Sequence, residues 1–286
     1  MTDIGAMLRR DLPPEQLLDT ARAIASLFDE LWIVEDLDWP GGVAQLASVL
    51  EATAGPDAPV IGHGVAPAPF RNPAALAMEW ATLARMYPGR LHAGIGHGVP
   101  GWMDRVGQSV ASPLTLLRET IESVRQILRG GRVSYDGRYV QLRDIDLVFP
   151  PDIVPPVLAG VTGPKSLELS GRVADGTVLS EGHDADQVRA ALAHIRADRE
   201  VDGAPTSHRF TLYVGYYLGD LTELPPPPTD GPEGGWAAVT DDSDEMVEQL
   251  QTVLDAGIDS MVIVPFGETI EQLERFATDI RPRLQR

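Results

Sequence analysis

The stretch LHAGIGHGVPGWM, which runs from Leu91 to Met103, is the most informative segment of this chain of 286 residues. It begins as a short apolar segment typical of a buried strand and continues through glycines at positions 94, 96 and 98. Glycine has no Cβ, so a bulky ligand can approach the backbone closely at such positions. His97 and Trp102 would add a polar group and a flat surface. The spacing is not the dinucleotide-binding fingerprint, because the third glycine follows the second too soon.

Outside this stretch, short apolar runs alternate with longer helical patterns. The expected strands cover residues 4–9, 30–35, 59–64, 91–96, 156–160, 176–180, 209–217 and 259–264. The expected helices cover residues 14–28, 43–54, 73–86, 113–129, 164–173, 184–198, 243–256 and 268–284. Eight strand–helix units predict a single α/β domain over residues 1–286, a (β/α)₈ TIM barrel. The alternative is a doubly wound open sheet, which rarely repeats so evenly.

Three segments interrupt the repeating pattern and are expected to be insertions: residues 98–112, 130–155 and 219–242. In the second segment, Asp136-Gly137 lies between apolar residues and predicts a β-hairpin. The third segment is rich in proline and glycine and follows the seventh strand. It is therefore expected on the catalytic face of the barrel, where it could act as a lid.

The composition excludes several classes of function. The net charge is -19, which argues against nucleic acid or an anionic membrane as a partner, since both need a basic surface. The chain has no cysteine, so disulfides, thiolate catalysis and cysteine-bound zinc are excluded. No apolar run is long enough to span a membrane and no leader is recognised, so a cytoplasmic location is expected.

Active sites of TIM barrels form at the carboxyl ends of the strands. Glu35 and Asp36 end the second expected strand, and one of two adjacent residues there would face the barrel mouth. That carboxylate could transfer a proton, or it could pair with an arginine. His63 and His97 end neighbouring strands and could contact a ligand, form structural hydrogen bonds, or bind a metal with Asp36. No closely spaced histidine pair supports a metal, and none is predicted.

Residues 162–166, with the sequence TGPKS, combine a glycine turn with the start of a helix. Free backbone amides at a helix N-terminus favour an anion, and the side chains of Lys165 and Ser166 add donors. The segment is therefore a candidate phosphate site. The alternative is an ordinary helix cap.

Several motifs together resemble the bacterial luciferase-like monooxygenase superfamily. They are GVAPAPFRNP at 64–73, YPGR at 87–90, GIG at 94–96, GPKSL at 163–167 and GRVADG at 171–176. The resemblance is greatest to the branch that uses coenzyme F420, a deazaflavin. It implies an oxidoreductase that transfers a hydride between the deazaflavin C5 and a C=C, C=N or C=O group of a small organic substrate. It also implies a homodimer. The alternatives are an FMN-dependent monooxygenase and a catalytically silent cofactor-binding barrel.

The resemblance also implies where the cofactor binds. Its ring would lie over the barrel mouth, on a bulge with a non-prolyl cis peptide bond at Gly64-Val65. Its phosphate would lie near Thr162, Gly163, Lys165 and Ser166. The other candidate cofactor contacts are Glu35, His63, Pro67, His97, Gly98 and Trp102.

Two departures from the family pattern affect catalysis. Relatives often carry Asp-His where this chain has Glu35-Asp36, and several carry glutamate at the position of Val99. The catalytic candidates are therefore Asp36, Glu35 and His97. The expected substrate contacts are Trp39, Phe70, Trp102, Ser180 and Glu181, and their aromatic rings predict a neutral, apolar substrate.

Overall fold

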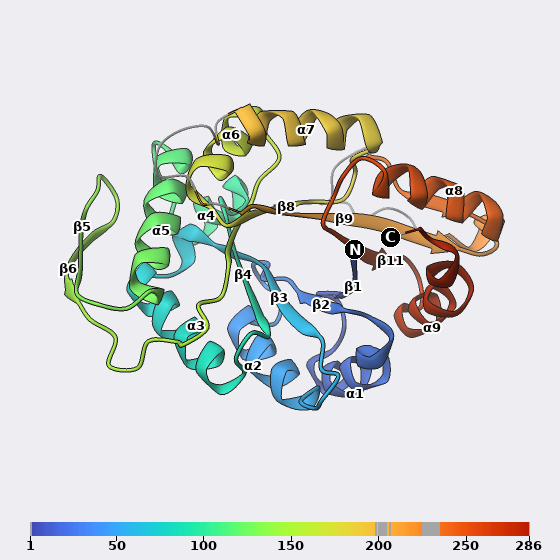
Figure 1. Cartoon of the computed structure of the whole chain (residues 1–286), viewed down its shortest axis with the longest axis horizontal. Coiled ribbons are helices and arrows are strands. Elements are labelled where there is room, and N and C mark those ends of the chain that lie inside the picture. Colours follow the sequence, from blue (N-terminus) through green and yellow to red (C-terminus); the bar gives the residue numbers. More distant parts are fainter. Residues whose placement is uncertain (1, 198, 200–204, 206, 225–234, 286) are drawn as a thin grey trace.

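Eight parallel strands close into a barrel surrounded by helices (Figure 1). The computed structural model describes residues 2–197, 199, 205, 207–224 and 235–285. In this part of the chain, the barrel order is β1-β2-β3-β4-β7-β8-β9-β11. Pairing of β8 with β9 and of β11 with β1 closes the ring. The predicted TIM barrel is thus confirmed, and the open sheet is wrong.

The bounds of the elements agree with the sequence pattern in most places. The barrel strands are β1 (Asp3–Leu8), β2 (Glu30–Ile33), β3 (Val60–Pro67), β4 (Leu91–Gly96), β7 (Val157–Gly160), β8 (Gly176–Leu179), β9 (Arg209–Leu218) and β11 (Ser260–Pro265). The main helices are α1 (Pro14–Ile24), α2 (Gly42–Ala52), α3 (Pro73–Met86), α5 (Pro113–Leu128), α6 (Pro164–Val173), α7 (Ala185–Ala197), α8 (Ser243–Leu254) and α9 (Thr269–Arg275). No helix of the described ranges is long and apolar enough to cross a membrane.

The last helix differs most from its expected length. It ends at Arg275 and continues as a π-helical turn, Phe276–Ile280, and a 3₁₀ turn, Arg281–Arg283. Pro282 in the last turn has no backbone N–H to donate, so a regular α-helix is not sustained there. The apolar spacing alone predicted one helix up to residue 284.

The insertions contain short elements of their own. The first holds α4 (Pro100–Arg105). The second forms the predicted hairpin, with β5 (Val133–Asp136) antiparallel to β6 (Gln141–Ile145), and it projects from the side of the barrel (Figure 1). In the third, β10 (Ala238–Thr240) pairs with β9, which the sequence pattern did not indicate. Residues 225–234 of the expected lid lie outside the described residues.

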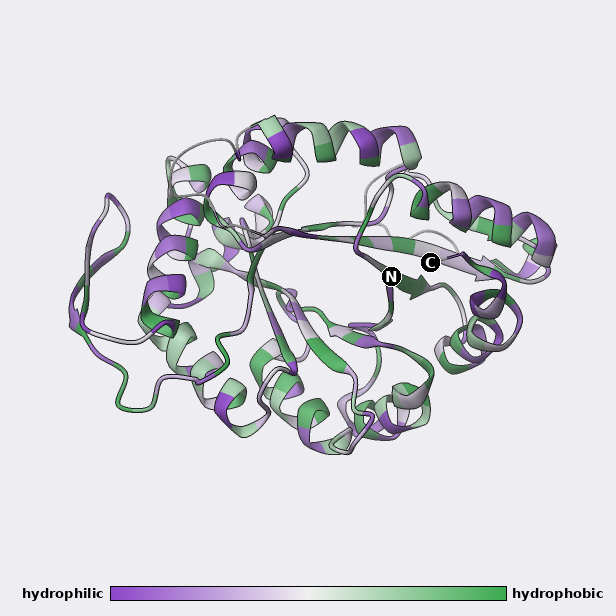
Figure 2. Cartoon of the chain, in the orientation of Figure 1, coloured by the Kyte–Doolittle hydropathy of each residue, from purple (hydrophilic) through white to green (hydrophobic). Residues whose placement is uncertain are grey.

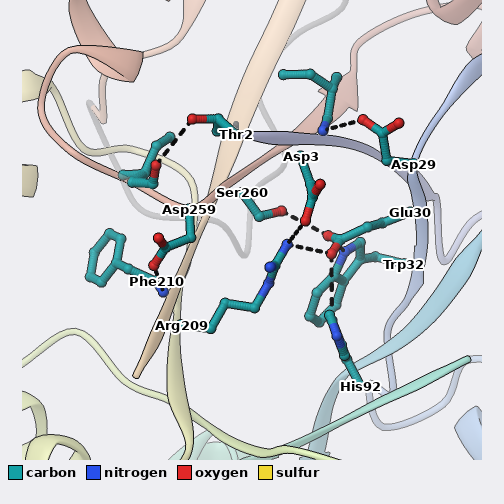
Figure 3. A network of polar contacts seen from close by, with 12 residues as sticks. Thr2, Asp3, Asp29, Glu30, Trp32, His92, Arg209, Phe210, Asp259 and Ser260 are labelled. Atoms are coloured by element: carbon teal, nitrogen blue, oxygen red, sulfur yellow. Dashed lines mark hydrogen bonds and ion pairs between the residues drawn. The ribbon is translucent and has the colours of Figure 1, made fainter. Parts of the chain in front are cut away.

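Side chains fill the barrel interior at the amino ends of the strands. Glu30 is buried and accepts hydrogen bonds from Trp32 Nε1 at 2.9 Å, Ser260 Oγ at 2.7 Å and Arg209 at 2.6 Å (Figure 3). Arg209 also binds Asp3 at 2.7 Å. Trp32 is fully buried above this network and meets the edge of the Tyr213 ring. These buried side chains form the base on which the residues at the carboxyl ends of the strands rest.

The helices pack on the outside of the strands through their apolar faces. They carry alternating hydrophilic and hydrophobic residues in Figure 2, as expected of helices with one face in water. The strand β11 is buried along its whole length, because the barrel interior covers one face and helices the other.

Candidate functional site

A cavity of about 800 Å³ opens at the carboxyl ends of the strands. This is the face on which TIM barrels carry their active sites. The strand-end residues expected from the sequence that line it are Glu35, Asp36, Trp39, Gly64, Val65, Pro67, His97, Gly98, Trp102, Thr162, Gly163, Ser166, Ser180 and Glu181. The structure thus brings most of the expected site residues together.

A bulge in β3 forms one side of the cavity. The register with β4 shifts between His63 and Ala66, and the peptide bond between Gly64 and Val65 is cis. This is the feature that the family resemblance implied at these two residues. The bulge directs the Val65 side chain toward β4 and β7, where Gly94 and Gly160 lie.

The glycines of β4 have a different role from the one expected. A Cβ on Gly94 would lie 2.7 Å from Val65 Cγ1, and one on Gly96 would lie 2.6 Å from Val65 Cγ2. Gly94 therefore makes room for Val65 rather than for a ligand, whereas Gly96 also lines the cavity. Gly98 has a φ of 73°, which glycine adopts readily, and it turns the chain after β4.

Glu35 is held in a dense set of contacts. Its carboxylate accepts two hydrogen bonds from Arg71, at 2.6 and 2.5 Å, and one from the Gly42 amide at 3.2 Å. His63 Nε2 lies 3.5 Å away. Burial by itself raises the pKa of Glu35, but the neighbouring His63 and Arg71 outweigh it and lower the pKa to about 2. Such a carboxylate stays charged near neutral pH and is a poor proton donor.

His63 does not reach the cavity. It is 0% exposed, lies behind Glu35, and meets the Trp80 ring edge to face. The expectation that it contacts a cofactor directly is therefore corrected, because Glu35 and the α2 terminus at Gly42 stand in front of it. Its position supports the structural alternative.

Asp36 lines the cavity beside Glu35. Arg10 donates a hydrogen bond to it at 2.7 Å, and the guanidinium of Arg10 lies 5.3 Å from the centre of the Trp39 ring. The prediction that only one of the two neighbouring residues would face the mouth is wrong. Strand β2 ends at Ile33, so both carboxylates follow the strand and are free of its alternation.

His97 links the end of β4 to the start of α6. Its Nε2 lies 2.9 Å from Ser166 Oγ. Burial lowers the pKa of His97, against a smaller opposing effect of the Pro113 backbone, so the neutral ring is favoured. The N-cap of α6 is Gly163, which has no side chain to accept from the first amides of the helix. Lys165 is exposed and does not line the cavity.

Several cavity residues were not expected from the sequence. Arg9, Arg10 and Asp11 follow β1, Phe266 follows β11, and Tyr213 lies in the middle of β9. The same strand-end rule would have found Arg9 to Asp11. Phe70, in contrast, was expected at the substrate and does not line the cavity, because it lies in the 3₁₀ turn Ala68–Phe70 beyond the bulge.

The described residues contain no group of three or more histidine, aspartate or glutamate side chains that could hold a metal ion. His97 lies against Ser166, and His63 lies against Glu35. The two histidines thus have separate partners.

The closed parallel barrel, with a cavity at the carboxyl ends of its strands, defines a protein of the TIM-barrel class. Residues 1–223 match the model of a family described as luciferase-like monooxygenase, and the chain belongs to that family. An F420-dependent glucose-6-phosphate dehydrogenase of Mycobacterium avium is 28% identical over 266 residues, covering 79% of each chain. A 5,10-methylenetetrahydromethanopterin reductase of Methanolobus tindarius is 31% identical over 159 residues, covering 56% of this chain and 48% of the reductase.

Solved structures share the fold at lower identity. An F420-dependent secondary alcohol dehydrogenase, in complex with an F420-acetone adduct, has a TM-score of 0.85, 19% identity and complete coverage of both chains. Monooxygenase RslO1 from Streptomyces bottropensis has a TM-score of 0.79 at 18% identity, covering 98% of this chain and 99% of the other.

Proposed function

We propose that this protein is an F420-dependent oxidoreductase acting on a small organic substrate. The observation that carries the proposal is the cavity, with its bulge in β3, in a chain whose relatives include an F420-dependent glucose-6-phosphate dehydrogenase matched over 79% of each chain. When bound, a deazaflavin supplies a carbon centre, C5, that gives or accepts a hydride.

The residues of the cavity fit such a group. The volume of about 800 Å³ is within the range of ligand cavities. Val65 and Gly64 offer a surface for a flat ring, and Gly98 and Trp102 stand on the β4 side. The start of α6 would hold a phosphate by the amide of Gly163 and the hydroxyl of Ser166, with Thr162 and Lys165 close in sequence.

Asp36 is the group proposed to donate or accept the proton that accompanies hydride transfer. The hydrogen bond from Arg10 fixes the orientation of this carboxylate. The Trp39 ring, which stacks against Arg10, would form one side of the substrate site. Glu35 is proposed to act through position rather than proton transfer, because its pKa of about 2 keeps it ionised. His97 would contact the cofactor as a neutral ring and remains the second candidate for proton transfer.

The proposal is tested by adding oxidised F420 and FMN separately to the purified protein. The fluorescence of F420 should be quenched on binding, with a micromolar dissociation constant. F420 should also raise the melting temperature of the protein more than FMN does. At about 100 times its dissociation constant, a ligand stabilises the folded state by ~2.7 kcal/mol. No F420 binding at high micromolar concentration would contradict the proposal.

A reduced-FMN monooxygenase is the second candidate, favoured by the family description and by the likeness to RslO1. It would consume oxygen when reduced FMN and a substrate are supplied. A protein that binds F420 yet turns over no member of a broad substrate panel would instead fit the silent barrel.

We also propose that the protein forms a homodimer. Exposed apolar side chains gather on α3 and on the segment between β6 and β7, namely Met78, Met86, Val148, Phe149 and Ile153. Arg85 Cζ of α3 lies 5.7 Å from the centre of the Phe149 ring, which ties the two segments together. An exposed apolar surface of this kind is typical of an interface.

A further inference from the structure

Glu181 differs from the other acidic residues of the cavity. It follows β8, on the side of the barrel opposite β2, and its side chain lines the cavity. The other three carboxylates that line the cavity are each neutralised by an arginine: Asp11 by Arg9, Glu35 by Arg71 and Asp36 by Arg10. Within the described ranges, the carboxylate of Glu181 has no hydrogen bond and no ion pair.

The sequence of the third insertion brings few basic side chains. Gly182 pairs with Trp236 in an antiparallel bridge, so the third insertion returns to Glu181. Residues 225–234 of that insertion have the sequence PPPPTDGPEG and contain no lysine, arginine or histidine. The net charge of -19 adds to the negative potential that Glu181 sets up in the cavity.

Tyr213 near the cavity floor does not offset this charge. Burial raises the pKa of its phenol well above the ordinary value, and the nearby carboxylates of Glu181, Glu30 and Asp36 raise it further. The phenol therefore stays neutral. The rings of Tyr213, Trp102 and Phe266 line the same cavity, and aromatic faces attract cations.

We propose that Glu181 determines substrate specificity, and that the substrate carries a positively charged nitrogen, as an amine or a protonated imine, on an apolar body. This inference rests on the proposed function, since it describes the substrate of the same cavity. It replaces the neutral substrate expected from the aromatic residues alone. An unpaired carboxylate in a partly enclosed cavity forms stronger hydrogen bonds with a charged donor than with a neutral one.

The test uses three probes of nearly equal shape: benzylammonium, benzyl alcohol and benzoate. Their dissociation constants are measured by calorimetry on the wild-type protein, without cofactor and then with saturating F420. Benzylammonium should bind at least about tenfold more tightly than benzyl alcohol, the size expected for a hydrogen bond to a charged group. Benzoate should bind most weakly.

Two variants and a control make the result specific. Glu181→Gln keeps the shape and should abolish the preference for benzylammonium, whereas Glu181→Lys should reverse it toward benzoate. Glu248→Gln removes the same charge from the exposed face of α8 and should change nothing. A preference that survives in Glu181→Gln, or the absence of benzylammonium binding to the wild-type protein at millimolar concentration, would overturn the inference. Because the cofactor-free series does not depend on F420, failure of F420 to bind would contradict only the proposed function.

Discussion

The side chain of Val65 occupies the space that a side chain at Gly94 would need. The Cβ of any other residue at position 94 would lie 2.7 Å from Val65 Cγ1 and 2.4 Å from the carbonyl oxygen of His63. The bulge of β3 and the glycine of β4 therefore depend on each other. A second strand contributes as well, since a Cβ on Gly160 would lie 2.7 Å from the same Cγ1.

Gly94→Ala should therefore destabilise the protein by about 1–3 kcal/mol, the usual cost of overpacking a core, and weaken F420 binding. Urea denaturation and F420 titration check the two effects. Gly101→Ala is the matched control, because a Cβ there meets nothing within 4 Å. Equal stability of the two variants would show that the bulge can move away from β4.

Glu35→Gln should destabilise the folded protein by about 1–3 kcal/mol at pH 7, because Arg71 then keeps only the more exposed carboxylate of Glu79, at 3.5 Å, as an ionised partner. The pKa of Glu35 falls from 4.5 to about 2 in the folded protein. The stability that its carboxylate provides is therefore complete above about pH 4.5 and is lost as the pH falls toward 2. Denaturation curves of both proteins between pH 7 and pH 3 should converge as the pH decreases. A difference that stays constant over this range would contradict the assignment.

Asp36→Asn should lower kcat about 100-fold or more, a typical contribution of general acid–base catalysis, and leave F420 affinity nearly unchanged. Steady-state kinetics and F420 titration separate the two effects. Asp38→Asn is the control: Asp38 lies outside the cavity with a φ of 73°, which asparagine also tolerates. Unchanged turnover in Asp36→Asn would remove the proposed role of Asp36.

Ser166→Ala should weaken F420 binding about tenfold, because it removes a donor to the proposed phosphate and the partner of His97. Ser243→Ala, at the start of α8, makes the same change in a helix away from the cavity and should bind F420 as the wild type does. If both variants bind F420 equally well, the phosphate does not lie at α6.

Phe149→Glu should convert the proposed dimer into a monomer, because it places a charge in an exposed apolar surface. Light scattering after size-exclusion chromatography measures the mass. The control is Asp136→Asn in the projecting hairpin, whose side chain pairs with exposed Arg143. A wild-type protein that elutes with a monomer mass would contradict the proposal.

The barrel could be predicted from the sequence because its strands and helices repeat with clear periods and several helices begin with proline. The contacts within the site were harder to predict from the sequence. The ends of strands located Asp36, His97 and Ser166, but nothing local shows that His63 lies behind Glu35 or that Gly94 packs against Val65. Those relationships join residues far apart in the chain, and only the closed barrel brings them together. The β10 strand was missed because three residues carry too little pattern.

The side chains that fill the barrel at the amino ends of the strands also affect the order in which ligands enter and leave the cavity. Glu30, Trp32 and Arg209 fill the barrel interior near the amino ends of the strands, and Trp32 contacts Tyr213, which lines the cavity at the carboxyl ends. The cavity therefore opens at the carboxyl ends of the strands. Two ligands that share such an opening must pass one after the other, and the one that lies deeper has to arrive first and leave last. If cofactor and substrate lie at different depths in this cavity, we therefore expect compulsory-order kinetics.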